Sequence, residues 1–247
     1  MDPSYTEAYE QFELRHWWFV ARREIIRQAI ARFVLPKFPN PRWLDIGCGT
    51  GVLLNAWPEI TDKIGLEMDG PSVQRAKAKG LDVRQVSPKW DFSEYGTFDF
   101  ITLTDVIEHV EHEQQAIDAV RAVLRNDGIL LITVPALMSL WSGHDVVNRH
   151  FRRYTRESLL RLFPGGQWTV LQASYFSSLL LPLIWTARKW KNFRTRGKEQ
   201  SHAGHDFKFG AMDGLLKTIF RLEKPLLRWM NLPLGSSVLL VLRKGGI

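Results

Sequence analysis

One stretch, residues 43–56, constrains the fold of this 247-residue chain more than any other. It opens with the apolar run WLDI, which predicts a buried strand containing one acid, Asp45. Gly-Cys-Gly-Thr-Gly follows at 47–51, and such glycines let the backbone turn tightly and approach a ligand without a Cβ in the way. A helix predicted at 52–56 offers free N–H groups and the positive end of its dipole. The stretch therefore predicts a cofactor-binding loop.

Strand and helix patterns alternate on either side of this loop. Short apolar runs predict strands at 63–69, 82–86, 98–103 and 128–134, and helical spacing of apolar residues predicts helices at 71–79 and 113–124. Asn126-Asp127-Gly128 is expected to end the second helix. The alternation predicts an α/β fold with a doubly wound, mainly parallel sheet. Ligands of such sheets bind at the carboxyl ends of the strands.

The loop differs from a dinucleotide-binding loop in two ways. Its third glycine comes one residue earlier than in Gly-x-Gly-x-x-Gly, and Asp45 would repel a pyrophosphate. A carboxylate at that place suits a cationic ligand. The arrangement resembles motif I of class I S-adenosylmethionine-dependent methyltransferases, in which the acid and the loop hold the methionine part of the cofactor.

Three segments together resemble the ubiquinone-biosynthesis-type group of these methyltransferases. They are residues 44–51, 98–100 and 105–110. Two further segments, HWWFVARR at 16–23 and the run from His144 to Thr155 that contains HFRRYT, are similar to a bacterial branch often linked to glycan or lipid-carrier pathways.

The resemblance implies a domain layout. It implies a seven-stranded Rossmann-like sheet, in which strands at 167–173 and 237–243 come last and the final one is inserted antiparallel. We expect an N-terminal helical cap over 1–36, a methyltransferase core over 37–247, and a basic and apolar helical insertion at 177–235.

The resemblance also implies cofactor contacts. Glu67 lies about 20 residues past the loop, where an acid holds the ribose diol. Asp69 competes for that role, or caps the following helix. Ser87 stands where the family often has an acid for the adenine amine, so Trp90 or Asp91 are alternatives. The expected cofactor-binding residues are Asp45, Gly47, Cys48, Gly49, Gly51, Glu67, Met68, Ser87, Thr104 and Asp105.

Methyl transfer to an oxygen requires removal of the hydroxyl proton. Three histidines near the predicted strand ends, His109, His144 and His150, are candidate catalytic bases. His109 has an alternative as a buried histidine bonded to the backbone. His144 and His150 follow the fifth strand, which faces the methyl group in this fold, and are the better candidates.

A metal site is a competing interpretation of the same residues. Asp105, Glu108 and His109 are spaced i, i+3 and i+4, so they would share one face of a helical turn. Together with His150 they resemble the metal-dependent methyltransferases that modify RNA 3′ ends and quinone precursors. Mg²⁺ or Mn²⁺ there would polarise a hydroxyl and lower its pKa.

Composition indicates a compartment and a class of partner. A single cysteine excludes an intramolecular disulfide, and the polar start and absence of an apolar run of about 18 residues favour a cytoplasmic protein. Residues 1–143 carry a net charge of −5 and residues 144–247 one of +12. The basic half favours an anionic substrate, an anionic membrane surface or nucleic acid.

The two ends of the predicted core carry helical additions. A helix over 5–34 with aromatic residues and two arginines is either a packing cap or a lid whose arginine holds an anionic group. The insertion contains a basic stretch, a polar segment at 197–210 expected to be mobile, and an amphipathic helix at 212–230. It is a lid, a homodimer face or a peripheral membrane contact.

These observations predict an S-adenosylmethionine-dependent methyltransferase. O-methylation of a small hydrophobic, lipid-linked or glycan-type acceptor is the first hypothesis. An RNA-modifying enzyme is the alternative, although the basic residues interleave with Leu, Ile and Trp rather than with exposed stacking aromatics. A non-catalytic protein that retains the fold is the third.

Overall fold

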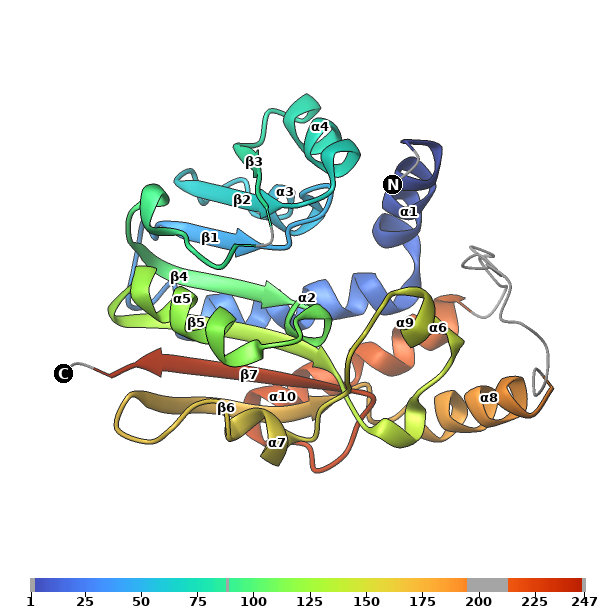
Figure 1. The fold of residues 1–247 in the computed structure, drawn as a ribbon. Helices are drawn as coiled ribbons and strands as arrows, with labels where there is room; N and C mark the ends of the chain where they lie inside the picture. Colours follow the sequence, from blue (N-terminus) through green and yellow to red (C-terminus); the bar gives the residue numbers. More distant parts are fainter. Residues whose placement is uncertain (1–2, 88, 195–212, 246–247) are drawn as a thin grey trace.

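A seven-stranded sheet forms the centre of the chain in a computed structural model, which describes residues 3–87, 89–194 and 213–245 (Figure 1). The strands are β1 (Trp43–Ile46), β2 (Lys63–Glu67), β3 (Val83–Gln85), β4 (Phe98–Thr104), β5 (Leu124–Pro135), β6 (Trp168–Phe176) and β7 (Ser237–Lys244). The helices are α1 (Pro3–Arg15), α2 (Trp17–Phe33), α3 (Val52–Asn55), α4 (Gly70–Ala78), α5 (Glu113–Val123), α6 (Gly143–Val147), α7 (Arg156–Leu160), α8 (Leu181–Arg194), α9 (Asp213–Arg221) and α10 (Glu223–Trp229). Short 3₁₀ turns are η1 (Ser93–Tyr95), η2 (Ile107–His109) and η3 (Met138–Leu140).

The strand order is β3-β2-β1-β4-β5-β7-β6. Strands β1 to β5 pair in parallel, and β7 lies antiparallel between β5 and β6. The direction of chain winding reverses between β1 and β4, and ligands of doubly wound sheets bind in the crevice at such a point. The predicted fold class, including the antiparallel last strand, is confirmed.

Alternation of side chains along the strands supplies a core on each face of the sheet. Leu44 of β1 points to the face covered by α5 and α7, whereas its neighbour Trp43 points to the face covered by α2, α3, α4, α9 and α10. Trp43 stacks on Phe100 of β4 with ring centroids 5.1 Å apart. Burial of such a large side chain stabilises the fold by roughly 1.5–3 kcal/mol.

The N-terminal helix is broken, contrary to the single helix expected over 5–34. His16 has extended backbone angles between α1 and α2, and its Nδ1 accepts a hydrogen bond from the Trp18 amide at 3.3 Å. This side chain therefore acts as the N-cap of α2. Helix α2 packs on the sheet through Ile26 and Ile30, which are fully buried.

The end of α5 also differs from the expectation. The helix stops at Val123 and β5 starts at Leu124, so Asn126-Asp127-Gly128 lies inside the strand. The register with β4 shifts there, and Asp127 has a φ of 62°. The extra residues form a bulge, because the chain must bend sharply to pair Leu124 and Ile129 with nearly adjacent residues of β4.

Helices α8, α9 and α10 come between β6 and β7 in the chain, whereas the two strands themselves are paired in the sheet. The helix expected at 212–230 is interrupted at Leu222, and the predicted mobile segment at 197–210 lies outside the described residues. Phe220 of α9 is buried against Phe176 and Trp17, with ring centroids 6.1 and 5.9 Å away. Helices α9 and α10 therefore pack on the core through a few buried side chains, and a lid role for the insertion stays a prediction.

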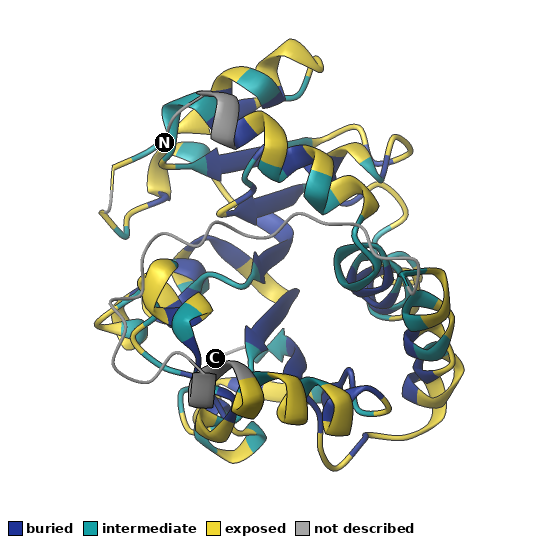
Figure 2. Cartoon of the chain, turned by 90° about the vertical axis from the view of Figure 1, so that its right-hand side faces the viewer, coloured by how far each residue is buried: buried dark blue, intermediate teal, exposed yellow. Residues whose placement is uncertain are grey.

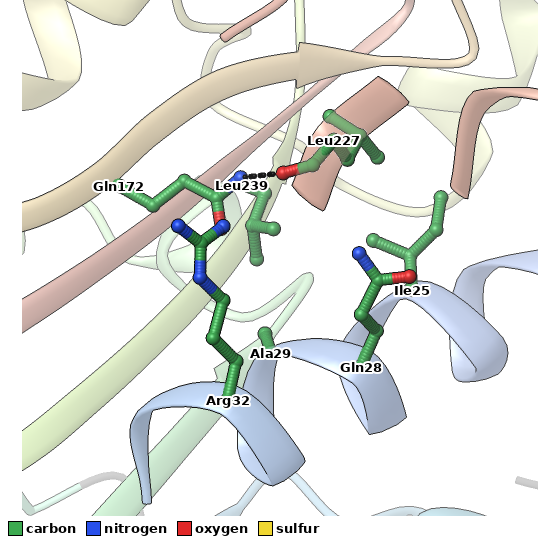
Figure 3. Close-up of a pocket in the computed structure, with 7 residues that line it drawn as sticks. All are labelled: Ile25, Gln28, Ala29, Arg32, Gln172, Leu227 and Leu239. Atoms are coloured by element: carbon green, nitrogen blue, oxygen red, sulfur yellow. Dashed lines mark hydrogen bonds between the residues drawn. The ribbon is translucent and has the colours of Figure 1, made fainter. Parts of the chain in front are cut away.

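Hydrogen bonds fix α10 between α2 and β6. Gln172 donates its side-chain amide to the carbonyl of Leu227 at 2.8 Å (Figure 3). Arg32 donates to the carbonyl of Arg228 at 2.6 Å. The gap left among these side chains is about 10 Å³, room for no more than a water molecule. Within the described ranges, no helix is both long enough and apolar enough to cross a bilayer.

Candidate active site

The candidate site lies where β2, β1, β4 and β5 end side by side. Figure 2 views the molecule from the side toward which these strands point in Figure 1, and shows the buried sheet edge flanked by helices. Glycine-loop and acidic residues follow β1 and β2, and the histidines follow β4 and β5. The strand order thus separates two groups of residues, which we call the cofactor half (Asp45, the loop at 47–51 and Glu67) and the acceptor half (Glu108, His109, Asp145 and His150) after the roles predicted for them.

Asp45 is a fully buried acid with one oxygen left without a partner. Its Oδ1 accepts a hydrogen bond of 2.6 Å from the hydroxyl of Thr102, which in turn accepts one of 2.8 Å from the Trp43 indole. Its Oδ2 is buried and has no hydrogen-bond partner. Burial raises the pKa of Asp45 to about 7. An unpaired buried carboxylate oxygen marks a place for a cation or a donor group.

The glycines of the loop have different roles. A Cβ on Gly47 would lie 2.6 Å from Val106, and one on Gly51 would lie 2.4 Å from Leu81, so both glycines allow close packing. Gly49, with a φ of +55°, has no other heavy atom within 4 Å of that position. The loop therefore leaves an open cradle above Gly49.

Glu67 fastens the loop from the end of β2. Its carboxylate accepts hydrogen bonds from the amides of Gly49 at 2.8 Å, Met68 at 2.7 Å and Asp69 at 2.9 Å. The carboxylate of Asp69 instead accepts from the amide and hydroxyl of Ser72 and caps α4. Of the two acids weighed for the ribose, Glu67 lies at the loop and Asp69 is committed to its helix.

The remaining expected cofactor residues differ in how far they are buried. Cys48 is buried, and burial raises the pKa of its thiol far above the usual range, which favours the neutral thiol. Met68 and Ser87 are exposed, and Thr104 is half-buried at the end of β4. Of the two alternatives for adenine, Asp91 accepts hydrogen bonds from Ser93, whereas Trp90 is half-buried against Phe92.

Arg22 of α2 attaches the N-terminal helices to the end of β4. It is buried and pairs with Asp105, whose other oxygen accepts a hydrogen bond of 3.1 Å from Thr133. The rings of Trp18 and Phe19 lie 4.9 and 5.1 Å from its guanidinium. One of the two arginines that could hold an anionic group, Arg22, is therefore paired with an acid of the chain itself.

Three of the four expected metal ligands come together. Ligand atoms of Glu108, His109 and His150 lie within 4.8 Å of one another. Both carboxylate oxygens of Glu108 are buried without a partner, and burial followed by the nearby Asp105 raises its pKa well above the usual value. Asp105 is not part of this group, because it precedes the single turn η2, has a φ of 57° and bonds Arg22.

His150 is oriented by Asp145, an acid that the sequence analysis did not single out as functional. The Nδ1 of His150 lies 3.0 Å from Asp145 Oδ1, which also accepts a hydrogen bond of 2.7 Å from Arg153. Burial opposes the charge of Asp145, but the bonds from His150 and Arg153 hold its pKa well below the usual range. The one sequence signal that could have drawn attention to Asp145 is its position three residues after Ser142, the spacing of a capping box.

The other two histidines differ from His150. His109 is exposed, contrary to the alternative of a buried histidine. Its ring packs edge-on against that of His150 with centroids 4.6 Å apart, and partial desolvation followed by His150 lowers its pKa. His144 is exposed, with its ring centroid 6.2 Å from that of His150. His150 is the candidate base whose ring nitrogen lies within hydrogen-bond distance of the ionised carboxylate of Asp145.

A family model of the methyltransferase domain matches residues 18–173, more than half of the chain. The chain belongs to the methyltransferase domain family. This membership confirms the predicted methyltransferase family.

Two curated relatives are named as O-methyltransferases. The chain is 25% identical over 172 residues to the malonyl-[acyl-carrier protein] O-methyltransferase of Paenibacillus sp. (strain JDR-2), covering 63% of this chain and 62% of the relative. It is 30% identical over 132 residues to the ubiquinone biosynthesis O-methyltransferase of Actinobacillus pleuropneumoniae serotype 7 (strain AP76), covering 46% and 56%. The chain thus spans about three fifths of the length of these relatives.

A solved structure agrees in fold over nearly the whole chain. The plantazolicin methyltransferase BpumL in complex with SAH superposes with a TM-score of 0.58 at 14% identity, covering 99% of this chain and 91% of the neighbour. At this identity the likeness concerns the fold alone.

Proposed function

We propose that this methyltransferase, of the ubiquinone-biosynthesis type, methylates a hydroxyl of a hydrophobic, lipid-linked or glycan-type acceptor, with His150 as general base. The observation that carries the proposal is the pair of His150 and Asp145 at the end of β5. The names of both curated relatives as O-methyltransferases support oxygen as the nucleophile.

The cofactor half has the features that the methyl donor requires. Asp45 offers an unpaired carboxylate oxygen for the amine of the methionine part of the cofactor, and the space above Gly49 admits that part. Glu67 offers a carboxylate for the ribose. When bound, S-adenosylmethionine supplies an electrophilic methyl group on a cationic sulfur.

The acceptor half supplies proton removal. The carboxylate of Asp145 is ionised and can only accept, so Nδ1 of His150 carries the proton of the ring. The Nε2 of the neutral ring then has the lone pair, and it takes the proton of the acceptor hydroxyl. A base positioned in this way contributes about 10²–10⁴-fold to the rate.

A divalent ion is a second candidate for activation of the hydroxyl, favoured by one observation. Glu108 has two buried oxygens without a partner, next to His109 and His150. A set of one carboxylate and two imidazoles suits Mn²⁺ better than Mg²⁺, which prefers oxygen ligands. Such an ion would lower the pKa of the hydroxyl.

Transfer of labelled methyl groups to octyl gallate, an amphiphile with phenolic hydroxyls, tests the proposal. His150→Ala should lower turnover at least 100-fold and leave affinity for S-adenosylhomocysteine within threefold. His144→Ala is the matched control and should retain most activity. Equal rates for His150→Ala and wild type would refute the base, and no transfer to any hydroxyl acceptor would refute the function.

The same assay separates the base from the ion. If His150 acts alone, EDTA leaves the rate unchanged and His109→Ala has a small effect. If an ion is used, EDTA abolishes the rate, Mn²⁺ restores it, and His109→Ala and Glu108→Gln are as damaging as His150→Ala.

A further inference from the structure

An apolar groove of about 390 Å³ lies outside the cofactor cradle and the histidine cluster. It lies between the loop after β5 and the first turns of α8. Its lining residues are Leu137, Ser139, Leu181, Pro182, Trp185 and Leu234. Five of these six side chains are apolar, and none is charged. The volume falls in the range of small-molecule sites, about 300–1,000 Å³.

Arg188 lies between the groove and the candidate active site. This residue follows Trp185 by one helical turn and donates a hydrogen bond to the carbonyl of Leu140, the residue after Ser139. Its guanidinium lies 3.8 Å from Oδ2 of Asp145. The same carboxylate holds His150. A molecule lying in the groove therefore has one end beside the residues that orient the base.

The charges at this end favour a polar head with negative or electron-rich character. Two guanidinium groups, Arg153 and Arg188, face the single carboxylate of Asp145. Burial followed by Arg153 lowers the pKa of Arg188 to about 10, so it stays protonated near neutral pH. One positive charge therefore remains uncompensated among these three groups.

The lining selects among the acceptor classes. A glycan would bring many hydroxyl groups into a groove that offers only the hydroxyl of Ser139, and unpaired polar groups are unfavourable. A hydrocarbon chain needs no such partners and gains from burial.

We propose that this groove binds the hydrocarbon chain of an amphiphilic acceptor, whose head group lies at Arg188 and presents its hydroxyl to His150. The reaction at the head group rests on the proposed function, whereas binding of the chain is measurable without catalysis. The groove would thus favour acceptors that carry a hydrocarbon chain.

Calorimetric titration with methyl, propyl and octyl gallate, below their aggregation concentrations, tests the groove directly. Wild type should bind about fourfold more tightly for each added methylene that enters the groove. Ser139→Trp, which fills the groove, and Trp185→Ala should flatten this dependence. Trp229→Ala is the matched control, because Trp229 is 83% exposed on α10 outside the groove. Ser139 and Trp185 are themselves exposed, so thermal melts of the variants should match wild type.

Three results would contradict binding of a hydrocarbon chain in the groove. A flat series in wild type, or an equal loss in Trp229→Ala, would overturn the proposal. So would flotation with phosphatidylglycerol vesicles that depends on Trp185 while the gallate series does not, since α8 would then be a membrane contact.

The two proposals fail separately. Chain-length-dependent binding without methyl transfer would keep the groove and overturn the function. Equal kcat/KM for all chain lengths would keep the function and overturn the groove.

Discussion

Replacement of Asp145 by Asn tests the central ion-pair cluster, because this one carboxylate neutralises buried charge and orients the base. The side chain of Asp145 is 0% exposed and that of Arg153 is 2% exposed. Asp145→Asn leaves the guanidinium of Arg153 buried without a counter-charge, while the side chain keeps its size. Breaking a buried pair in this way destabilises a protein by about 3–5 kcal/mol. For a domain of this size that lowers Tm by roughly 6–20 °C.

The effect should depend on pH with a definite sign. The folded-state pKa of Asp145 lies below its ordinary value of 3.8, so its contribution to stability is present above about pH 4 and is lost as pH falls further. The difference in Tm between wild type and Asp145→Asn should be constant from pH 6 to pH 8 and shrink below about pH 4. Turnover at pH 7 should fall by about 100-fold, because the proton of His150 is no longer fixed on Nδ1.

Differential scanning calorimetry and methyl-transfer assays measure these two effects. Asp127→Asn is the matched control, since its side chain is 64% exposed and its ion pairs are 3.7 and 3.9 Å long. It should change stability by less than about 0.5 kcal/mol. A Tm for Asp145→Asn within 2 °C of wild type at pH 7, with full activity, would refute the reasoning about this cluster.

Two further predictions concern the cofactor half. Affinity for S-adenosylhomocysteine should increase from pH 6 to pH 8, because Asp45, with its pKa raised to about 7, must be ionised to hold an amine. Asp45→Asn should remove that dependence and weaken binding about 10- to 100-fold, as calorimetry would show, and an unchanged pH profile would contradict this. Gly49→Val should abolish this binding while costing about 1–2 kcal/mol for a side chain at positive φ. Gly51→Val should destabilise the fold more, because its side chain would clash with Leu81. Retained binding of S-adenosylhomocysteine by Gly49→Val would contradict the open cradle.

The sequence by itself determined the local structure that carries the expected cofactor residues. Asp45, the glycine loop and Glu67 belong to a strand, a turn and the next strand, and such units are specified by residues close together in the chain. The alternation of apolar runs and helical spacing predicted the parallel strands in their correct places for the same reason. The errors at His16, Leu222 and 126–128 are boundary errors. The helix cap at His16 and the bulge in β5 set these boundaries, and the periodicity of apolar residues does not predict such local geometry.

Only the tertiary structure decided the acceptor half. Arg22 pairs with Asp105 across 83 positions of the chain, and that contact removes Asp105 from the metal cluster. Arg188 reaches Asp145 only because α8 packs beside the loop after β5. Which loops share the sheet edge follows from the strand order β1-β4-β5-β7, in which sequential strands are not always neighbours. Charge pairing and groove shape depend on those long-range neighbours, so local sequence patterns do not specify them.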